Sequence, residues 1–414
     1  MAMLRFVSSL LVLLCAGPLH SAEWDRYRGP NGSGVETAWR FPTQWEAADI
    51  AWKTNLPGEG HGSPVIWGGR VFLLAADPKT SERMPLCVDL ESGKILWQGH
   101  EATGKFKGHR FNGPATSTPA VADDAVYFAW GTAEQLTLAA YDHDGQSLWK
   151  QDLGPVVGGH GFGASPMVLG DLLVLNNDQE KQNGFLIALN RHTGETVWKV
   201  ARKSQRISYS VPVVYPHPAT GEPLLVFTNW THGFTVINPK DGAVVAELSV
   251  FSQEQNERAI SSPIVWRDLV IGTCGFTNNP KHCVAVRLKA DNTLEEVWRI
   301  ERSVPHIPSV IAVGDHVFLW DDSGIVTCVD PATGKDLWRE RVETDGQVFG
   351  SPVSDGSSLF LADQSGTVHV IRADGTFGVL ARNPLDETCR TTPAMGGGKL
   401  LVRTLSHLTA VRAR

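Results

Sequence analysis

Short apolar runs joined by polar or glycine turns recur along most of the chain. Several begin at a Ser-Pro or Thr-Pro step, as in SPVIWGGRVFLLA from Ser63, TPAVADDAVYFAW from Thr118 and SPIVWRDLVIG from Ser262. Two short apolar runs on either side of a Gly or Asp turn predict a β-hairpin. After residue 22 we find no apolar pattern with the helical period, so the chain is predicted to be all-β.

A second repeated element follows the hairpins and ends in tryptophan. Gly334 stands four residues before Trp338, and the same spacing joins Gly93 to Trp97. Successive anchor positions of this kind lie 40 to 52 residues apart, which is the length of a four-stranded propeller blade. The Pro steps number eight: Pro64, Pro119, Pro166, Pro212, Pro263, Pro308, Pro352 and Pro393. The sequence therefore predicts an eight-bladed β-propeller of four-stranded antiparallel blades.

The last repeat is one strand short. After Pro393 the chain has room only for two further strands, LLVRTL and HLTAVRA. Near the start, Ile50 to Lys53 have the pattern of an outer strand with its own Trp52, but no repeat surrounds them. Joining the two would complete the eighth blade and remove the exposed edges of an open ring. We therefore expect an arm at 23–49 and a propeller at 50–414, closed by its N-terminal strand.

The repeated tryptophans and glycines have structural roles in this interpretation. An indole offers a large apolar surface and an N–H that can reach a backbone carbonyl of the neighbouring blade. The predicted blade anchors are Trp52, Trp97, Trp149, Trp198, Trp298 and Trp338. The glycines of the same turns, Gly93, Gly145, Gly194, Gly334 and Gly375, are expected at positive φ.

The first 22 residues have the pattern of a secretory signal peptide. Arg5 precedes eleven mostly apolar residues from Phe6 to Ala16, and Pro18 breaks the segment. The apolar run is too short for a transmembrane helix. We expect cleavage after Ser21 or Ala22, a periplasmic or secreted protein, and no transmembrane anchor.

Charge and motifs narrow the classes of function. The formal net charge of −7 argues against a general nucleic-acid binder. The sequence has no C-x-x-C-H haem site, no H-E-x-x-H zinc motif and no paired C-x-x-C, and GGHGFG from Gly158 lacks the Lys of a phosphate loop. We therefore assign no catalytic residue, no metal site and no resident cofactor.

Two cysteines are candidates for a disulfide. Cys274 and Cys283 are equidistant from Asn278 and Asn279, at the expected tip of a hairpin. In that register the two side chains face each other across the strands, and an oxidising compartment would allow them to bond.

Polar residues precede the Pro steps of all eight repeats. They are His61, Asn112, His160, Arg206, Arg258, His306, Gln347 and Arg390. The connections that enter the inner strands gather at one end of a propeller axis. These side chains could form a basic funnel mouth for a carboxylate, a sugar acid or an acidic peptide. Alternatively, they pair with blade-edge carbonyls and with Glu257 or Glu387.

The repeats resemble those of the pyrroloquinoline-quinone (PQQ)-like β-propeller family, in which Asp/Asn, Thr/Ser-Gly and Trp recur on the turn before the outer strand. The resemblance covers about residues 50 to 412. It is strongest to BamB-type outer-membrane assembly proteins and to secreted bacterial PQQ-like repeat proteins that begin with W-x-x-[FY]-R-G-P-N-G-S-G, here Trp24 to Gly34.

The resemblance implies a non-catalytic binding or scaffold propeller with a protein or polymer partner in the cell envelope, in a role such as BamB-like assembly. Two alternatives stay open: a small quinoprotein dehydrogenase that uses PQQ with calcium, or a carbohydrate-associated accessory protein. The quinoprotein dehydrogenases of the superfamily are longer and many have a disulfide between adjacent cysteines, whereas no two cysteines adjoin in this chain.

Overall fold

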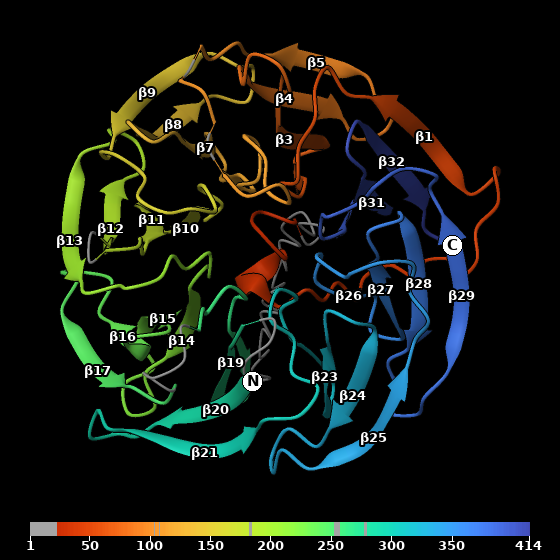
Figure 1. The fold of residues 1–414 in the computed structure, drawn as a ribbon. Helices are drawn as coiled ribbons and strands as arrows, with labels where there is room; N and C mark the ends of the chain where they lie inside the picture. Colours follow the sequence, from red (N-terminus) through yellow and green to blue (C-terminus); the bar gives the residue numbers. More distant parts are fainter. Residues whose placement is uncertain (1–22, 103, 107, 182–183, 252–256, 277–279) are drawn as a thin grey trace, which may run out of the picture.

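The computed structural model describes residues 23–102, 104–106, 108–181, 184–251, 257–276 and 280–414. Over these residues it confirms the predicted architecture: eight antiparallel sheets of four strands each are arranged as a closed ring around one axis (Figure 1). The predicted signal peptide at 1–22 lies outside the described residues. In the described part of the chain, no helix has the length and apolarity needed to cross a membrane.

Each blade is a meander from an inner to an outer strand. The first four blades are β2 (Val65–Trp67), β3 (Arg70–Ala76), β4 (Arg83–Asp89) and β5 (Ile95–Gln98); β6 (Ala120–Val121), β7 (Val126–Gly131), β8 (Leu136–Tyr141) and β9 (Ser147–Asp152); β10 (Met167–Leu169), β11 (Leu172–Asn177), β12 (Gly184–Asn190) and β13 (Thr196–Arg202); and β14 (Val213–Pro216), β15 (Pro223–Asn229), β16 (Gly233–Ile237) and β17 (Val244–Leu248).

The other four blades continue around the ring in chain order. They are β18 (Ile264–Trp266), β19 (Leu269–Cys274), β20 (His282–Leu288) and β21 (Leu294–Ile300); β22 (Ile311–Val313), β23 (His316–Trp320), β24 (Ile325–Val329) and β25 (Asp336–Arg341); β26 (Val353–Ser354), β27 (Ser358–Ala362), β28 (Thr367–Arg372) and β29 (Val379–Pro384); and β30 (Ala394–Gly396), β31 (Lys399–Arg403), β32 (His407–Arg412) and β1 (Ile50–Asn55).

The first strand closes the last blade, as predicted. β1 pairs antiparallel with β32, and Trp52 lies opposite Ala410. In Figure 1, β1 takes the place on the rim that β5, β9 and the other outer strands take in their blades. The ring is therefore held shut by pairing between the two ends of the propeller sequence.

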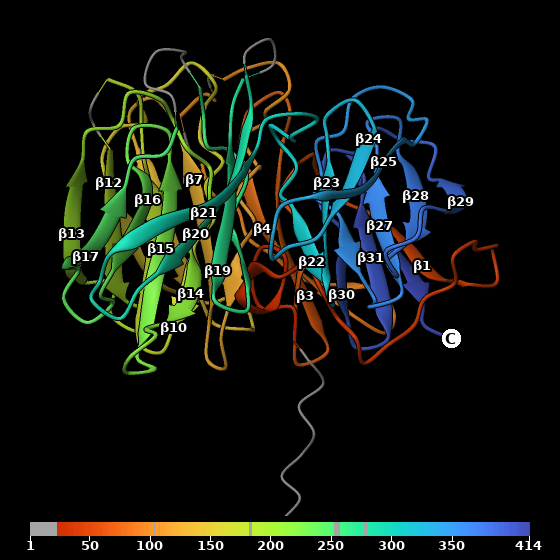
Figure 2. The ribbon, with the colours of Figure 1, turned by 90° about the horizontal axis from the view of Figure 1, so that it is seen from below.

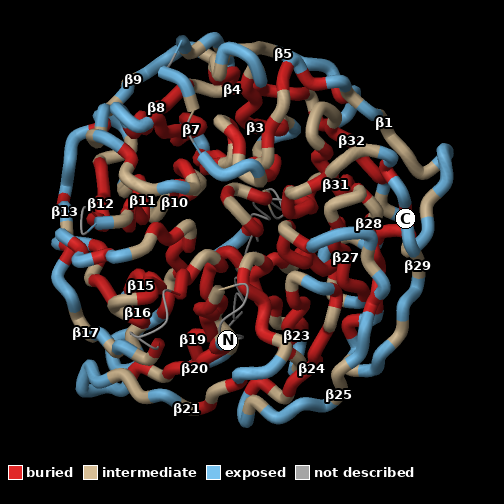
Figure 3. The backbone as a smooth tube through the Cα atoms, viewed as in Figure 1, coloured by how far each residue is buried: buried red, intermediate tan, exposed pale blue. Residues whose placement is uncertain are grey.

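The core lies between the blades. β7 and β8 are buried along their whole length, whereas the outer strand β9 is mostly exposed, and Figure 3 shows the same inside-to-outside gradient around the ring. One apolar cluster joins Phe72 of one blade to Phe128 of the next. Middle strands buried on both faces explain why the apolar runs of the sequence are nearly continuous.

The six predicted tryptophan anchors are confirmed. Each indole N–H donates to a backbone carbonyl of the following blade: Trp52 to Leu90 at 2.9 Å, Trp97 to His143 at 2.8 Å, Trp149 to Arg191 at 2.9 Å, Trp198 to Pro239 at 2.8 Å, Trp298 to Pro331 at 2.8 Å and Trp338 to Gly375 at 2.7 Å. The five predicted turn glycines all have positive φ. At Gly93 a Cβ would lie 2.5 Å from the Trp52 ring, so the indole itself requires glycine there.

Hydroxyl residues two positions before the inner strands form a belt of hydrogen bonds around the axis. Each hydroxyl accepts the backbone N–H of the residue at the same position in the preceding blade: Thr118 from Ser63, Ser165 from Thr118, Ser262 from Val211, Ser309 from Ser262, Ser351 from Ser309, Thr392 from Ser351, and Ser63 from Thr392, all at 2.9–3.1 Å. Val211 takes the eighth place without a hydroxyl. The repeated Ser or Thr therefore joins neighbouring blades where the inner strands begin.

The N-terminal arm lies across the axis inside the ring. Trp24 is fully buried and pairs with Ile66 of β2, while the Arg28 guanidinium donates to the Val310 carbonyl before β22 at 2.9 Å. Asn31, in the short 3-10 helix η1 (Pro30–Gly32), exchanges two hydrogen bonds with the backbone of Val214 in β14. Figure 2 shows this red segment in the lower half of the ring. The arm therefore contacts inner strands on several sides of the axis.

The predicted disulfide is wrong. Both cysteines are free and buried, because the hairpin register is shifted by one residue: Cys274 pairs with His282, and Cys283 pairs with Thr273. A shift of one residue sends a side chain to the other face of the sheet. Cys274 packs in one inter-blade cluster and Cys283 in the next, so the sheet itself separates the two thiols.

Candidate functional site

A cavity of about 560 Å³ lies on the propeller axis. Its wall contains seven of the eight predicted axial residues: His61, Asn112, His160, Arg258, His306, Gln347 and Arg390. The eighth, Arg206, is not among the lining residues and lies 3.7 Å from the Glu180 carboxylate. The structure thus brings together residues from seven separate connections. In the sequence these residues are spread over 330 positions, from His61 to Arg390.

The floor of this axial cavity comes from the arm and the hydroxyl belt. Tyr27 lines the cavity together with belt residues that include Ser63, Thr118 and Ser262. The Tyr27 hydroxyl is 2.9 Å from the Ser351 Oγ. The arm beneath Tyr27 contacts the inner strands, so the cavity is closed at its base and opens on the face where the connections enter the inner strands.

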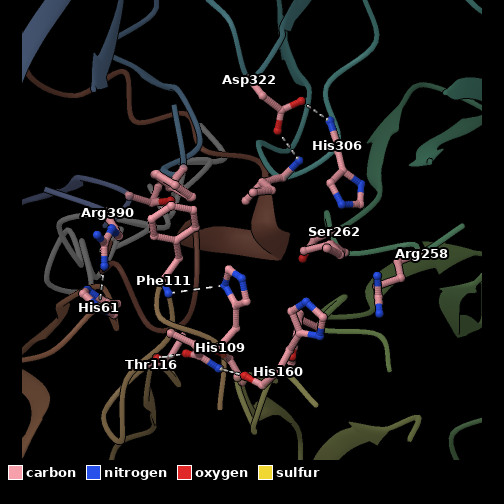
Figure 4. Close-up of a pocket in the computed structure, with 18 of the residues that line it drawn as sticks. His61, His109, Phe111, Thr116, His160, Arg258, Ser262, His306, Asp322 and Arg390 are labelled. Carbon is pink, nitrogen blue, oxygen red and sulfur yellow. Dashed lines mark hydrogen bonds between the residues drawn. The ribbon is translucent and has the colours of Figure 1, made fainter. Parts of the chain in front are cut away.

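Arg390 is the cation of one wall. Its guanidinium carbon lies 5.1 Å from the centre of the Phe111 ring and 5.5 Å from that of Phe349, and the two rings are 5.3 Å apart. Figure 4 shows Arg390 beside His61, whose Nε2 is 3.5 Å from an Arg390 Nη1. Within the described residues, no carboxylate forms an ion pair with Arg390. Burial lowers the pKa of this guanidinium.

A second guanidinium stands behind the same histidine. Arg403 is fully buried and donates to the carbonyls of Gly62 and Leu74 at 2.9 and 2.7 Å, and the described residues give it no carboxylate partner. Burial, reinforced by the positive charges of Arg390 and Arg403, lowers the pKa of His61 to about 3. At neutral pH His61 is therefore uncharged, and this side of the cavity has a net positive charge.

The opposite wall is built differently. Arg258 lies 3.4 Å from the Glu180 carboxylate and 5.2 Å from the centre of the Phe276 ring. His306 meets Phe276 edge-on at 5.9 Å, and its Nδ1 is buried without a hydrogen-bond partner. Burial lowers the pKa of His306 to about 4. On this wall the arginine therefore already has a carboxylate partner, and an aromatic ring lies beside it.

Several lining residues were missed by the sequence analysis. They include Tyr27, His109, Phe111, Tyr209, Phe276 and Phe349. His109 stacks on His160 at 5.1 Å and meets the Phe111 ring edge-on at 5.2 Å. For some of them a signal was available: an aromatic residue lies within three positions of four of the predicted polar residues, as Phe111 does beside Asn112 and Phe349 near Gln347.

The two carboxylates predicted as alternative partners of the axial residues, Glu257 and Glu387, were wrong. Glu257 contacts His282 at 3.3 Å instead of Arg258. Glu387 accepts hydrogen bonds from Ser406 and contacts His407 at 2.9 Å instead of Arg390. Asn112 does behave as a structural residue, because its amide donates to the His160 carbonyl at 2.6 Å.

The family model described as "Outer membrane protein assembly factor BamB" matches residues 43–129, 86–340 and 322–413, and so covers nearly the whole propeller. The chain belongs to this family. The resemblance seen in the repeats is confirmed at the level of the PQQ-type propeller repeat.

Two curated BamB-family relatives are distant in sequence. "Outer membrane protein assembly factor BamB" of Burkholderia pseudomallei is 24% identical over 347 residues, which cover 83% of this chain and 81% of the relative. The Yersinia pestis protein of the same name is 27% identical over 232 residues, covering 54% of this chain and 51% of the relative. The first match extends over most of both proteins, and the second over about half of each.

Solved structures show the same fold at lower identity. BamB from Moraxella catarrhalis is 15% identical with a TM-score of 0.62, and the match covers 88% of this chain and 99% of that one. A quinohemoprotein alcohol dehydrogenase from Comamonas testosteroni is 12% identical with a TM-score of 0.65, covering 95% and 80%. At such identities the likeness concerns the propeller fold alone.

We tested whether the axial cavity of this BamB-family chain suits a calcium-bound quinone. Its described wall has one carboxylate, Asp322, which already accepts the His306 and Ile307 amides at 2.8 and 3.0 Å and binds Lys281 at 2.9 Å. Calcium takes six to eight oxygen ligands. The described wall does not fit a calcium ion, whereas the unpaired Arg390 fits an anion.

Proposed function

We propose that this BamB-family protein is a non-catalytic binding propeller of the cell envelope that holds protein segments during assembly. The observation that carries the proposal is the match to an assembly factor over four-fifths of both chains. The signal-peptide pattern of the first 22 residues supports the periplasmic location. In this proposal the partner is a protein and no reaction is catalysed.

The outer strands offer a surface for such a partner. Exposed apolar side chains stand on the rim, among them Leu96, Leu148 and Leu337, which are 49%, 51% and 51% exposed. Each belongs to the last strand of its blade, whose outer edge has no neighbour in its sheet. An extended segment can add to a free edge through main-chain hydrogen bonds, while its side chains pack on apolar residues.

The test is capture of envelope proteins by the purified mature protein. We expect wild-type protein to enrich outer-membrane proteins from a solubilised envelope extract, as identified by mass spectrometry. A variant with Leu96→Lys, Leu148→Lys and Leu337→Lys should lose this enrichment, because edge charges oppose strand addition. Circular dichroism checks that the variant is folded. Equal profiles for wild type and variant, or no enrichment by wild type, contradict the proposal.

A further inference from the structure

The axial cavity contains a cation without a counter-ion. The buried Nε of Arg390 has no hydrogen-bond partner, and one of its terminal nitrogens has only the 3.5 Å contact to neutral His61. A guanidinium has five N–H donors in a planar fork that matches a carboxylate. Although the whole chain has a net charge of −7, Arg390 lines this wall and Arg403 lies buried behind it, with no carboxylate bound to either in the described residues.

We infer that the axial cavity binds a carboxylate carried on an apolar or aromatic body. Arg390 receives the carboxylate, and the rings of Phe111 and Phe349 pack against the body. The inference concerns a ligand site on the axis and does not depend on which protein the outer strands hold.

The apolar part of the inference comes from the rings around the cavity. Phe111 and Phe349 stand together beside Arg390, and Phe276 stands on the opposite wall with His306 against its edge. A cavity of about 560 Å³ falls within the range that encloses a small organic ligand. A bare inorganic anion would leave most of this aromatic surface without a partner.

The closed floor restricts how a ligand enters. Tyr27 and the arm block the base of the axis, so a polymer cannot thread through the ring. A free small carboxylate and the carboxyl end of a peptide share the required chemistry, because each can enter with its carboxylate leading.

The test is calorimetric titration with N-acetyl-phenylalanine and with the uncharged N-acetyl-phenylalaninamide at pH 7. We expect one-to-one binding of the acid and at least tenfold weaker binding of the amide. Replacing Arg390 by Gln should weaken binding of the acid roughly ten- to a hundredfold, since hydrogen bonds between charged partners are lost. Equal affinity for acid and amide, or no heat with either, overturns the inference.

Arg206→Gln is the matched control. It removes one positive charge from a side chain near this face that does not line the cavity, so it should change the affinity less than threefold. If Arg206→Gln and Arg390→Gln weaken binding equally, the effect is long-range electrostatics and the assigned site is wrong. Arg390→Lys keeps the charge and loses the planar fork; it should bind the acid less tightly than wild type even if the Gln variant does not fold.

A hexapeptide that ends in Phe, with a free or an amidated C-terminus, separates the two sources of the carboxylate. Binding of the free-ended peptide as well as the small acid assigns the site to chain ends. Binding of the small acid alone assigns it to free carboxylates. Both outcomes need Arg390, and neither uses the rim variants that test the proposed function, so the two proposals can fail separately.

Discussion

At the scale of single residues, two histidines that line the axial cavity make folding sensitive to acid. Their pKa values in the folded protein are about 3 for His61 and about 4 for His306, below the ordinary value of 6.5. As the pH falls below 6.5, the unfolded chain binds protons at these residues before the folded chain does. The free energy of unfolding should therefore decrease steadily between pH 6.5 and 4.

Thermal melting followed by circular dichroism measures this effect. Between pH 7 and pH 4.5, the melting temperature of the double variant His61→Gln and His306→Gln should fall less than that of wild type. His100→Gln, which replaces a 62% exposed histidine, should follow the wild-type curve. If the double variant also follows it, the two axial histidines do not cause the acid sensitivity.

A second residue-scale prediction separates backbone strain from steric contact at the blade turns. Gly93 and Gly221 have nearly equal positive φ, 71° and 73°, but only Gly93 lies against a ring, that of Trp52. Gly221→Ala should cost about 1 kcal/mol of unfolding free energy for the left-handed backbone. Gly93→Ala should cost about 2–4 kcal/mol, because the indole must also move. Equal costs in urea unfolding would show that the Trp52 contact is unimportant.

At the scale of elements, the arm and the hydroxyl belt meet most closely at Ser351. Ser351 Oγ accepts the Ser309 amide at 2.9 Å and lies 2.9 Å from the Tyr27 hydroxyl. Tyr27→Phe removes the bond from the arm to Ser351 and the longer one, 3.4 Å, to Thr392, and should cost about 1 kcal/mol. Ser351→Ala removes both bonds of the Ser351 hydroxyl and leaves a buried amide unpaired, so it should cost about 2–4 kcal/mol in urea unfolding. A smaller loss for Ser351→Ala than for Tyr27→Phe would contradict this role of the belt.

The sequence predicted one strand pair correctly and the register of another incorrectly. The closing pair of β1 and β32 could be predicted, because one repeat lacked a strand and Ile50 to Lys53 supplied it. The pairing of Cys274 with Cys283 failed by one residue. Equal distance from an assumed hairpin tip does not fix a register, since the turn geometry sets it.

At the scale of the whole molecule, the repeats determine the ring and long-range packing determines the axial cavity. Polar positions before the Pro steps predicted seven lining residues, because repeat position fixes the distance from the axis. Tyr27 could not be placed, since the arm belongs to no repeat. Phe111 and Phe349 lie 238 positions apart in the sequence and meet only when the ring closes.

Ring closure can be tested by shortening the chain after Thr404. The deletion removes β32, which leaves β1 without its partner and exposes an edge of β31. We expect loss of the cooperative thermal transition of the whole propeller, as measured by circular dichroism and calorimetry. As a control, full-length Leu96→Lys, changed on an exposed rim position, should keep a single transition. A sharp wild-type transition in the shortened chain would show that closure contributes little to stability.

The same closing pair sets an order of events during folding. β1 is the first strand of the chain, and its partner β32 begins only at His407, so β1 keeps an open edge until almost the entire sequence is available. Closing so long a loop is slow, and an unpaired edge can pair with other chains in the meantime. Folding of the ring therefore ends where the chain began, with the first strand of the propeller receiving the last.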